Sequence, residues 1–318
     1  MALQPDNVVP SESLPPFLRR LFVEQGEARL RTGWRLLLHL AMSLTLLVCF
    51  SVPLGVAYAF ADLSGQKMDL SSLMLLSTTA SAPSFLLATW IARRFLDKRS
   101  FVSLGLRLDR QALVDLGAGL LISGIQMALV FLAELALGWI RLEGWSVRDG
   151  AVIEAIGGLA GWLLVYIVVG LYEEVTFRGY YLQNLSTGIG PIWGILVSSA
   201  VFSLFHMWNP GAGLMSTAGI ILAGLYLAVA CVRTRRLWLP IGVHIGWNFF
   251  QGPVFGFPVS GTSSFRLLRQ TPTGPVPFTG GPFGPEAGLV VIPAMLLGIL
   301  LVFLLTKGRQ EAAQQSSP

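Results

Sequence analysis

Two adjacent glutamates, Glu173 and Glu174, end an apolar run, and Arg178 follows the second by four residues. Between Ile156 and Leu171 this run has no charged residue, which predicts a membrane helix. Ionisable groups are costly in such a helix and therefore suggest a functional site. In a helix Arg178 can pair with Glu174, while Glu173 points about 100° away toward another partner. For this stretch alone, a simple ion pair at the membrane surface is the alternative.

Two later apolar stretches each carry a histidine with a neighbour on the same helix face. His206 follows Phe202 by four residues, and Asn248 follows His244 by four. Each histidine, taken alone, could also be a hydrogen-bonded packing residue. The third histidine, His39, has no polar neighbour at helical spacing, and we expect it to pack near the cytoplasmic end of the first membrane helix.

These groups are nearly all the strongly polar side chains inside the later membrane helices. Polar groups in a bilayer must be satisfied by one another or by water, so we expect them to meet in one wet cavity. A buried glutamate can act as a general base, imidazoles can bind a metal or orient water, and an asparagine amide can donate to an oxyanion. The set is most consistent with hydrolysis of an acyl bond. The candidate catalytic residues are Glu173, Glu174, His206, His244 and Asn248.

The composition predicts the elements that must position these residues. Hydrophobic residues make up 53% of the 318, charged residues only 12%, and the mean hydropathy is +0.66. Soluble domains carry roughly 25% charged residues. We therefore predict an all-α polytopic membrane protein, with the lipid bilayer as a partner. The net charge of +5 needs no nucleic acid to explain it, and the two cysteines lie in predicted helices, which gives no disulfide framework.

About eight apolar stretches are predicted to span the membrane. Arginines and lysines gather before the first, between the second and third, between the sixth and seventh, and after the eighth. These positions share one side if every stretch spans, so we predict cytoplasmic termini and a multi-pass protein of the cell inner (plasma) membrane. The predicted stretches lie near 36–61, 71–92, 113–138, 152–172, 192–206, 213–232, 237–251 and 288–306.

The depth of His206 raises a difficulty. If the fifth stretch spans from Pro191, His206 lies roughly 22 Å along it, near the outer face. Glu173 would then lie nearer the cytoplasm. Either the fourth stretch continues to about Asn184, or the fifth begins deeper in the membrane.

The chain divides into a membrane domain with short tails. We predict a cytoplasmic tail over 1–34, a membrane domain over 35–310 and a C-terminal tail over 311–318. The segment 252–287 is predicted to lie outside the cytoplasm, and its seven prolines exclude a regular helix. A flexible linker is the favoured interpretation of this segment, and a loop folded back over the helices is the alternative.

Three motifs follow one another on successive predicted helices. Their order resembles that of the CAAX protease and bacteriocin-processing family of intramembrane proteases, also called the Abi family. The resemblance covers roughly residues 150–250. The motifs are Glu173-Glu174-x-x-x-Arg178, Phe202-x-x-x-His206 and His244-x-x-x-Asn248.

The resemblance implies a role for each residue. Glu173 and His206 would activate the hydrolytic water, and His244 and Asn248 would bind a metal or stabilise the oxyanion. Zinc or another divalent metal would be held by Glu173, His206 and His244. A metal-free glutamate mechanism is equally compatible, because the chain lacks the His-Glu-x-x-His spacing typical of zinc peptidases. The supporting residues would be Glu174, Arg178 and Phe202.

The function we expect is intramembrane endopeptidase activity on a peptide or membrane-protein substrate in a prokaryotic inner membrane. A catalytically idle relative that binds a membrane partner is one alternative. A transporter that uses the glutamates and histidines as a proton or cation relay is another. The sequence leaves the substrate, the oligomeric state and the use of a metal open.

Overall fold

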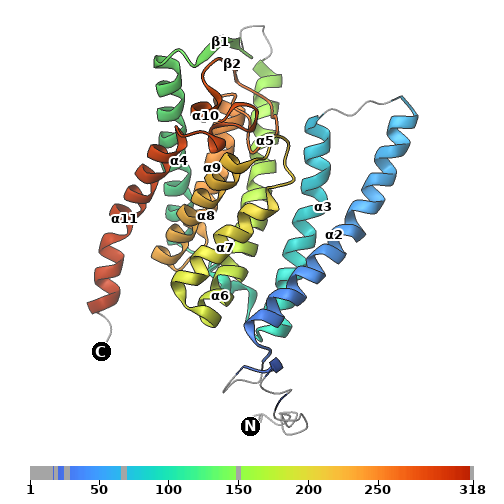
Figure 1. Cartoon of the computed structure of the whole chain (residues 1–318), viewed down its shortest axis with the longest axis vertical. Helices are drawn as coiled ribbons and strands as arrows, with labels where there is room; N and C mark the ends of the chain where they lie inside the picture. Colours follow the sequence, from blue (N-terminus) through green and yellow to red (C-terminus); the bar gives the residue numbers. More distant parts are fainter. Residues whose placement is uncertain (1–16, 18–20, 25–28, 66–69, 148–151, 316–318) are drawn as a thin grey trace.

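The computed structural model of the chain describes residues 17, 21–24, 29–65, 70–147 and 152–315. Helices make up most of it, and Figure 1 shows them running mostly side by side. The α-helices are α2 (Thr32–Leu63), α3 (Leu70–Ile91), α4 (Arg110–Ala136), α5 (Val152–Glu174), α6 (Leu182–Ile189), α7 (Pro191–Phe205), α8 (Leu214–Thr234), α9 (Trp238–Phe249), α10 (Val276–Thr279) and α11 (Val291–Gln315).

Shorter elements join or extend these helices. One antiparallel pair of strands, β1 (Ile140–Trp145) and β2 (Leu268–Pro272), connects the α4–α5 loop to the segment before α11, with Ile140 opposite Pro272. The π-helical segments are Ala92–Leu96, Val175–Tyr181 and Phe250–Val254, and the 3₁₀-helical segments are Phe101–Leu104, Gly281–Phe283 and Pro285–Ala287.

The described residues confirm an all-α polytopic membrane protein. Six helices are long and apolar enough to cross a membrane, and α7 is a shorter apolar helix. The seventh predicted stretch is α9, which the π-helical segment Phe250–Val254 extends. The predicted C-terminal tail begins inside α11, which stays helical to Gln315. The six long spans are Thr32–Leu63, Met74–Leu96, Arg110–Ala136, Val152–Ile189, Leu214–Thr234 and Val291–Arg309.

The fourth span is much longer than the sequence pattern predicted. The expected end near residue 172 is wrong, and the alternative that the stretch continues to about Asn184 is confirmed, because the helix runs on from α5 through the π-helical segment Val175–Tyr181 into α6. It ends at Gly190, whose backbone has φ +91°, and Pro191 then begins α7. This continuation places Glu173 in the interior of a 38-residue span and brings it to the depth of His206.

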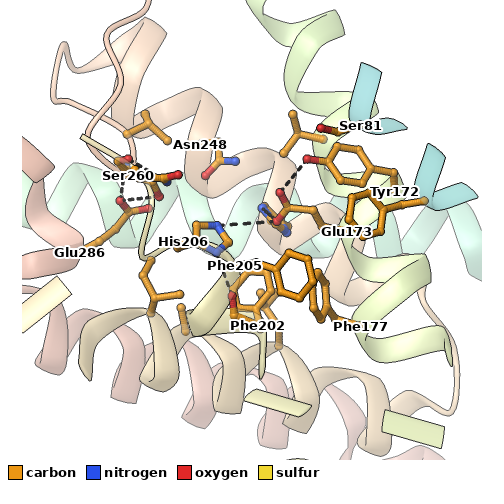
Figure 2. A pocket seen from close by; sticks show the side chains of 18 of the residues that line it. Ser81, Tyr172, Glu173, Phe177, Phe202, Phe205, His206, Asn248, Ser260 and Glu286 are labelled. Carbon is orange, nitrogen blue, oxygen red and sulfur yellow. Dashed lines mark hydrogen bonds and ion pairs between the residues drawn. The ribbon is translucent and has the colours of Figure 1, made fainter. Parts of the chain in front are cut away.

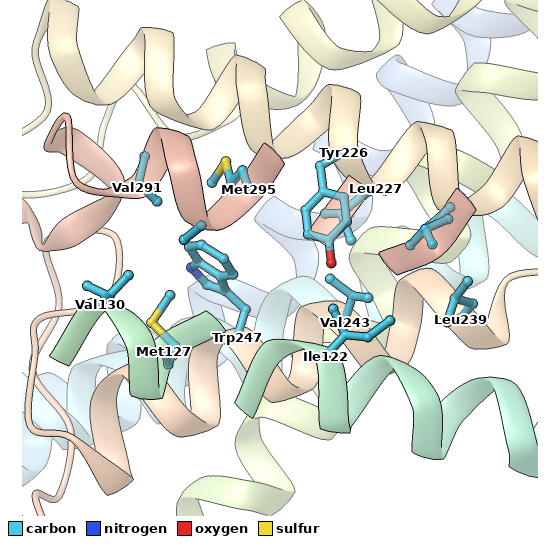
Figure 3. Close-up of a cluster of buried hydrophobic side chains, with 13 residues drawn as sticks. Ile122, Met127, Val130, Tyr226, Leu227, Leu239, Val243, Trp247, Val291 and Met295 are labelled. Atoms are coloured by element: carbon cyan, nitrogen blue, oxygen red, sulfur yellow. The ribbon is translucent and has the colours of Figure 1, made fainter. Parts of the chain in front are cut away.

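Helix α9 packs very closely on α4. A Cβ atom on Gly119 of α4 would lie 2.5 Å from the backbone nitrogen of Val243, and Gly242 of α9 approaches the backbone of Leu116 in the same way. Small residues allow such backbone contact between membrane helices. Figure 3 shows the apolar cluster beside this contact, where Met127, Trp247 and residues of α8 and α11 pack together.

The segment 252–287 is folded, so the favoured interpretation of a flexible linker is wrong. Its turns are held by backbone hydrogen bonds, for example from the Gly261 N–H to the Phe283 carbonyl at 2.9 Å and from the Phe257 N–H to the Gln251 carbonyl at 2.9 Å. We call residues 255–288 the cap. The cap lies at the end of the bundle opposite α6 (Figure 1). Its glycines with positive φ permit these tight turns.

Helices α2 and α3 lie beside the core and are fastened to it at one end. Asp97, just after α3, accepts from Arg35 of α2 at 2.5 Å and from Arg93 at 2.9 Å, and the Asn184 side chain of α6 also contacts Arg35. His39 is buried nearby, with Nε2 3.0 Å from the Thr89 hydroxyl, which fits the expected packing role. All of these polar groups lie on the side of the bundle where α2 begins.

Candidate active site

A cavity of about 900 Å³ lies between the α2–α3 pair and the helices α5, α7, α8 and α9. Most of its wall is apolar. Four of the five predicted catalytic residues line it, namely Glu173, His206, His244 and Asn248. The fifth, Glu174, lies behind the wall. The cap closes one end of the cavity and contributes Ser260 and Glu286 (Figure 2).

The carboxylate of Glu173 faces the cavity with one oxygen held and the other free of hydrogen bonds. The Tyr172 hydroxyl donates to Oε1 at 3.1 Å. Oε2 has no hydrogen-bond partner among the described residues, and it lies 3.9 Å from Nε2 of His206 and 3.7 Å from Nε2 of His244. Both imidazoles therefore lie close to this buried oxygen without a direct hydrogen bond to it.

The C-terminal end of α7 fixes the tautomer of His206. Nδ1 lies 2.9 Å from the carbonyl oxygen of Phe202, which is one of the last carbonyls of the helix and has no partner within it. A carbonyl only accepts, so Nδ1 carries the proton and Nε2 is left to face Glu173. The ring also packs on Phe202, with centroids 4.6 Å apart. Phe202 thus contacts His206 in two ways, through its backbone carbonyl and through its ring.

Glu174 holds His244 from behind. Its Oε1 accepts from Nδ1 of His244 at 2.8 Å and from Nη1 of Arg178 at 2.9 Å. The side chains of Glu174 and Arg178 are 0% and 2% exposed, so neither reaches the cavity. Glu174 was predicted to be catalytic, but its side chain lies outside the cavity and contacts His244, which is the geometry of a positioning residue. The physical reason is the helical offset between neighbouring residues, which turns only Glu173 toward the cavity.

Arg178 is enclosed by several weaker contacts as well. Its guanidinium carbon lies 4.2 Å from the centre of the Phe202 ring, and Nη2 donates to the Gly224 carbonyl at 3.3 Å. These contacts connect the π-helical segment after α5 with the C-terminal end of α7 and the middle of α8 around one buried cation. Arg178 therefore contacts the first two motifs directly and the third through Glu174, and its supporting role stays a prediction.

Asn248 lies one helical turn after His244 on α9, and its side chain points into the cavity (Figure 2). Its amide is a hydrogen-bond donor near the centre of the site. The close contact between α4 and α9 fixes the position of both residues, because α9 cannot shift without moving against the α4 backbone.

The donor types for a metal are present, but their atoms are not gathered as a metal site. Zinc ligands lie about 2.0–2.3 Å from the ion. Among the described residues, no group of three or more His, Cys, Asp or Glu side chains has the arrangement of a metal site. Both imidazoles do present Nε2 to the cavity while Nδ1 is held by another group, as metal-bound histidines do. Two imidazoles held in this way could equally form hydrogen bonds to a water molecule.

Three residues of the site were missed in the sequence. Tyr172 precedes Glu173 directly and was treated as part of the apolar run. Ser260 and Glu286 belong to the cap, which the sequence analysis assigned no role in the site. One signal for Glu286 was available, since it is the single acidic residue between 252 and 287.

Comparison with known proteins agrees with this geometry. Residues 155–250 match the family model described as type II CAAX prenyl endopeptidase Rce1-like. The protein described as "Putative membrane peptidase YdiL" of Bacillus subtilis (strain 168) is 28% identical over 106 residues, which are 33% of this chain and 41% of YdiL. The chain thus matches less than half the length of this relative. No solved structure matches the chain. Residues 155–250 contain all three motifs, and both comparisons support the resemblance to the CAAX protease and bacteriocin-processing family over this part of the chain.

Proposed function

We propose that the protein is an intramembrane endopeptidase that hydrolyses a peptide bond with a water molecule activated by Glu173 and His206. The observation that carries this proposal is Oε2 of Glu173, which has no hydrogen-bond partner among the described residues and faces Nε2 of His206 and of His244 at 3.9 and 3.7 Å. A family match to peptidases supports it.

The chemistry follows from which atoms face the cavity. Glu173 takes a proton from the bound water while the water oxygen attacks the scissile carbonyl carbon. The amide of Asn248 is available to donate to the developing oxyanion, and so is Nε2 of His244 when that ring is protonated. The carbon–nitrogen bond then breaks, and Glu173 or His206 returns the proton to the leaving amine. Both products leave with the elements of water added.

Two neighbours prepare this step without touching the substrate. Glu174 keeps Nε2 of His244 aimed at the cavity, because the same ring donates from Nδ1 to Glu174. The Phe202 carbonyl does the same for His206. Preorganised groups of this kind need little rearrangement when charge develops.

A divalent metal remains part of the proposal as an alternative. Glu173, His206 and His244 are the residues that would hold it. When bound, it would polarise the scissile carbonyl as a Lewis acid. The residues named here would still bind and orient the substrate.

The proposed substrate is a peptide or membrane-protein segment that reaches the cavity from the bilayer. Apolar side chains of α2 and α3, including Leu44 and Phe85, form one side of the cavity. We also propose the cell inner membrane as the location and the cytoplasm as the side of both termini, because arginines gather at the ends of the helices on that side.

The test is cleavage of fluorogenic membrane peptides by the purified full chain. Wild type is compared with Glu173→Gln and His206→Ala, each with and without a chelator. Glu154→Gln is a matched control, since Glu154 is an exposed glutamate at the start of the same helix. Cleavage by wild type and the control alone supports the proposal, and loss of activity with chelator supports a metal. Equal cleavage by Glu173→Gln would refute it.

A further inference from the structure

The cap places a second carboxylate in the cavity. Glu286 is 4% exposed and belongs to the short 3₁₀-helical segment Pro285–Ala287. Its Oε2 accepts from the backbone N–H of Ser260 at 2.6 Å and from the Ser260 hydroxyl at 3.0 Å. Both donors are neutral, and both come from the cap itself.

Three other buried carboxylates of the described chain have arginine partners, whereas Glu134 of α4 and Glu173 have none. Glu174 pairs with Arg178, Asp97 with two arginines, and Asp115 with Arg309 at 2.7 Å. No lysine or arginine is among the described residues that line the cavity around Glu286. A carboxylate that is buried without a cation loses the free energy of its hydration, and neutral hydrogen-bond donors replace only part of it. The His206 imidazole is the titratable group that acts on Glu286 within this cavity, and no permanently charged cation is among the described residues that line it. A lysine, arginine or amino-terminal cation at Glu286 would therefore have to come from a bound substrate.

The backbone around Glu286 is fixed by contacts with the core. The Asn209 side chain donates to the Ser260 carbonyl at 3.0 Å. Gly219 of α8 lies so close to the Glu286 carbonyl that a Cβ atom there would overlap it. Ser260 itself has φ +47°, an uncommon conformation for a residue with a side chain. Contacts from the α7–α8 connection and from α8 thus hold the backbone on which the carboxylate and Ser260 stand.

The position of Glu286 relative to the proposed reaction is visible in Figure 2. His206 lies between Glu286 and Glu173, and all three line the same cavity. The side of the cavity formed by α2 and α3 carries no charged residue among those described and is mostly apolar, with the hydroxyl groups of Ser77, Thr78 and Ser81 as its polar groups. A peptide with its scissile bond at Glu173 would therefore extend toward apolar side chains in one direction and toward a carboxylate in the other.

We propose that Glu286, held by Ser260, is a specificity subsite for a positively charged group of the substrate, either a lysine or arginine side chain or a free amino terminus. This group would lie on the other side of the scissile bond from the hydrophobic substrate residues. The inference rests on the peptidase function proposed above. A substrate cation at this site would form a charge-assisted hydrogen bond with the buried carboxylate, which has no such partner when the cavity is empty.

The test uses one hydrophobic peptide made with lysine or with norleucine beside the scissile bond, and a third version whose only cation is its amino terminus. Each is measured for cleavage and, as a dye-labelled peptide, for binding by fluorescence anisotropy. Wild type should prefer the lysine or free-amine peptide over norleucine by about tenfold or more, the factor expected for one charge-assisted hydrogen bond. Acetylating the amino terminus separates the two sources of charge.

The variant Glu286→Gln should reduce this preference toward unity, because it removes the negative charge that attracts the cation. Its amide keeps the shape of the side chain, and its oxygen can still accept from Ser260. The exposed Glu154→Gln variant should keep it. Equal kcat/KM for the lysine and norleucine peptides in wild type would overturn the subsite and leave the peptidase function standing. Binding that prefers lysine and depends on Glu286, without any cleavage, would support the subsite and refute the peptidase function. Because the wild-type comparison needs no mutation, it decides the inference even if Glu286→Gln does not fold.

Discussion

The buried pair of Glu174 and Arg178 gives the sharpest test of how the site is built. Replacing Glu174 by glutamine removes the negative charge but keeps an oxygen that can accept from His244. Arg178 would then be a buried cation, 2% exposed, without its carboxylate at 2.9 Å. Breaking a buried pair by removing one partner destabilises a protein by roughly 3–5 kcal/mol. Glu174→Gln should therefore lower stability by about this amount.

Removing the arginine instead of the glutamate should lower the stability less. In Arg178→Met the carboxylate of Glu174 loses the arginine but keeps His244 at 2.8 Å, and this ring can carry a proton. We expect a loss nearer to about 1–3 kcal/mol, the usual cost of an imperfectly paired buried group. The double variant Glu174→Gln/Arg178→Met leaves neither charge and should recover most of the stability lost in Glu174→Gln, because apolar replacement of a whole buried pair is often neutral.

The measurements are thermal and denaturant unfolding in detergent, together with peptide cleavage. The unfolding free energies of the single and double variants measure the interaction between Glu174 and Arg178. Cleavage by the double variant measures whether His244 keeps its orientation without that ion pair. A double variant as unstable as Glu174→Gln would refute the reasoning about the ion pair. A loss below about 1 kcal/mol for Glu174→Gln would refute it as well, since that is the range of exposed pairs.

Three further predictions concern the surroundings of the site. Asp97→Asn leaves two buried arginines without their carboxylate, and it should lower the Tm and make the α2–α3 pair more sensitive to protease. Gly119→Ala puts a Cβ atom 2.5 Å from the backbone nitrogen of Val243, so it should separate α4 from α9 and reduce cleavage, whereas Gly117→Ala, with nothing within 4 Å, should not. Burial raises the pKa of the Glu286 carboxyl above its ordinary value of 4.5. Its contribution to stability is thus fully present below pH 4.5 and is lost as the pH rises through the raised pKa, so the Tm of Glu286→Gln relative to wild type should increase with pH, and a constant difference would contradict this.

The limits of the sequence interpretation are clearest at the fourth span. The apolar run ends near residue 172, and the polar residues that follow look like the end of a membrane helix. In the structure Glu174 and Arg178 satisfy each other and His244, so the helix continues to Ile189 with these groups buried. The spacing of Glu174 and Arg178 allowed this pairing, and a continuation to about Asn184 was one of two alternatives. Contact with α7, α8 and α9 decides between them, and the local sequence does not contain that contact.

The cap shows the same limit more strongly. Its prolines and glycines exclude a regular helix, but they do not distinguish a flexible linker from an ordered loop. What orders it is contact with Gly219 and Asn209, which lie far away along the chain. Because that contact could not be foreseen, neither could the place of Glu286 in the cavity.

The sequence by itself determined the membrane class, the apolar stretches and the pairing of residues at helical spacing, since hydrophobicity and the period of a helix are local properties. The types and spacing of the residues were therefore enough to select Glu173, His206, His244 and Asn248. The tertiary structure decided which of the two glutamates faces the cavity, how deep the site lies and what closes it. Those outcomes depend on which helix faces meet, and that is set by packing between segments far apart in the chain.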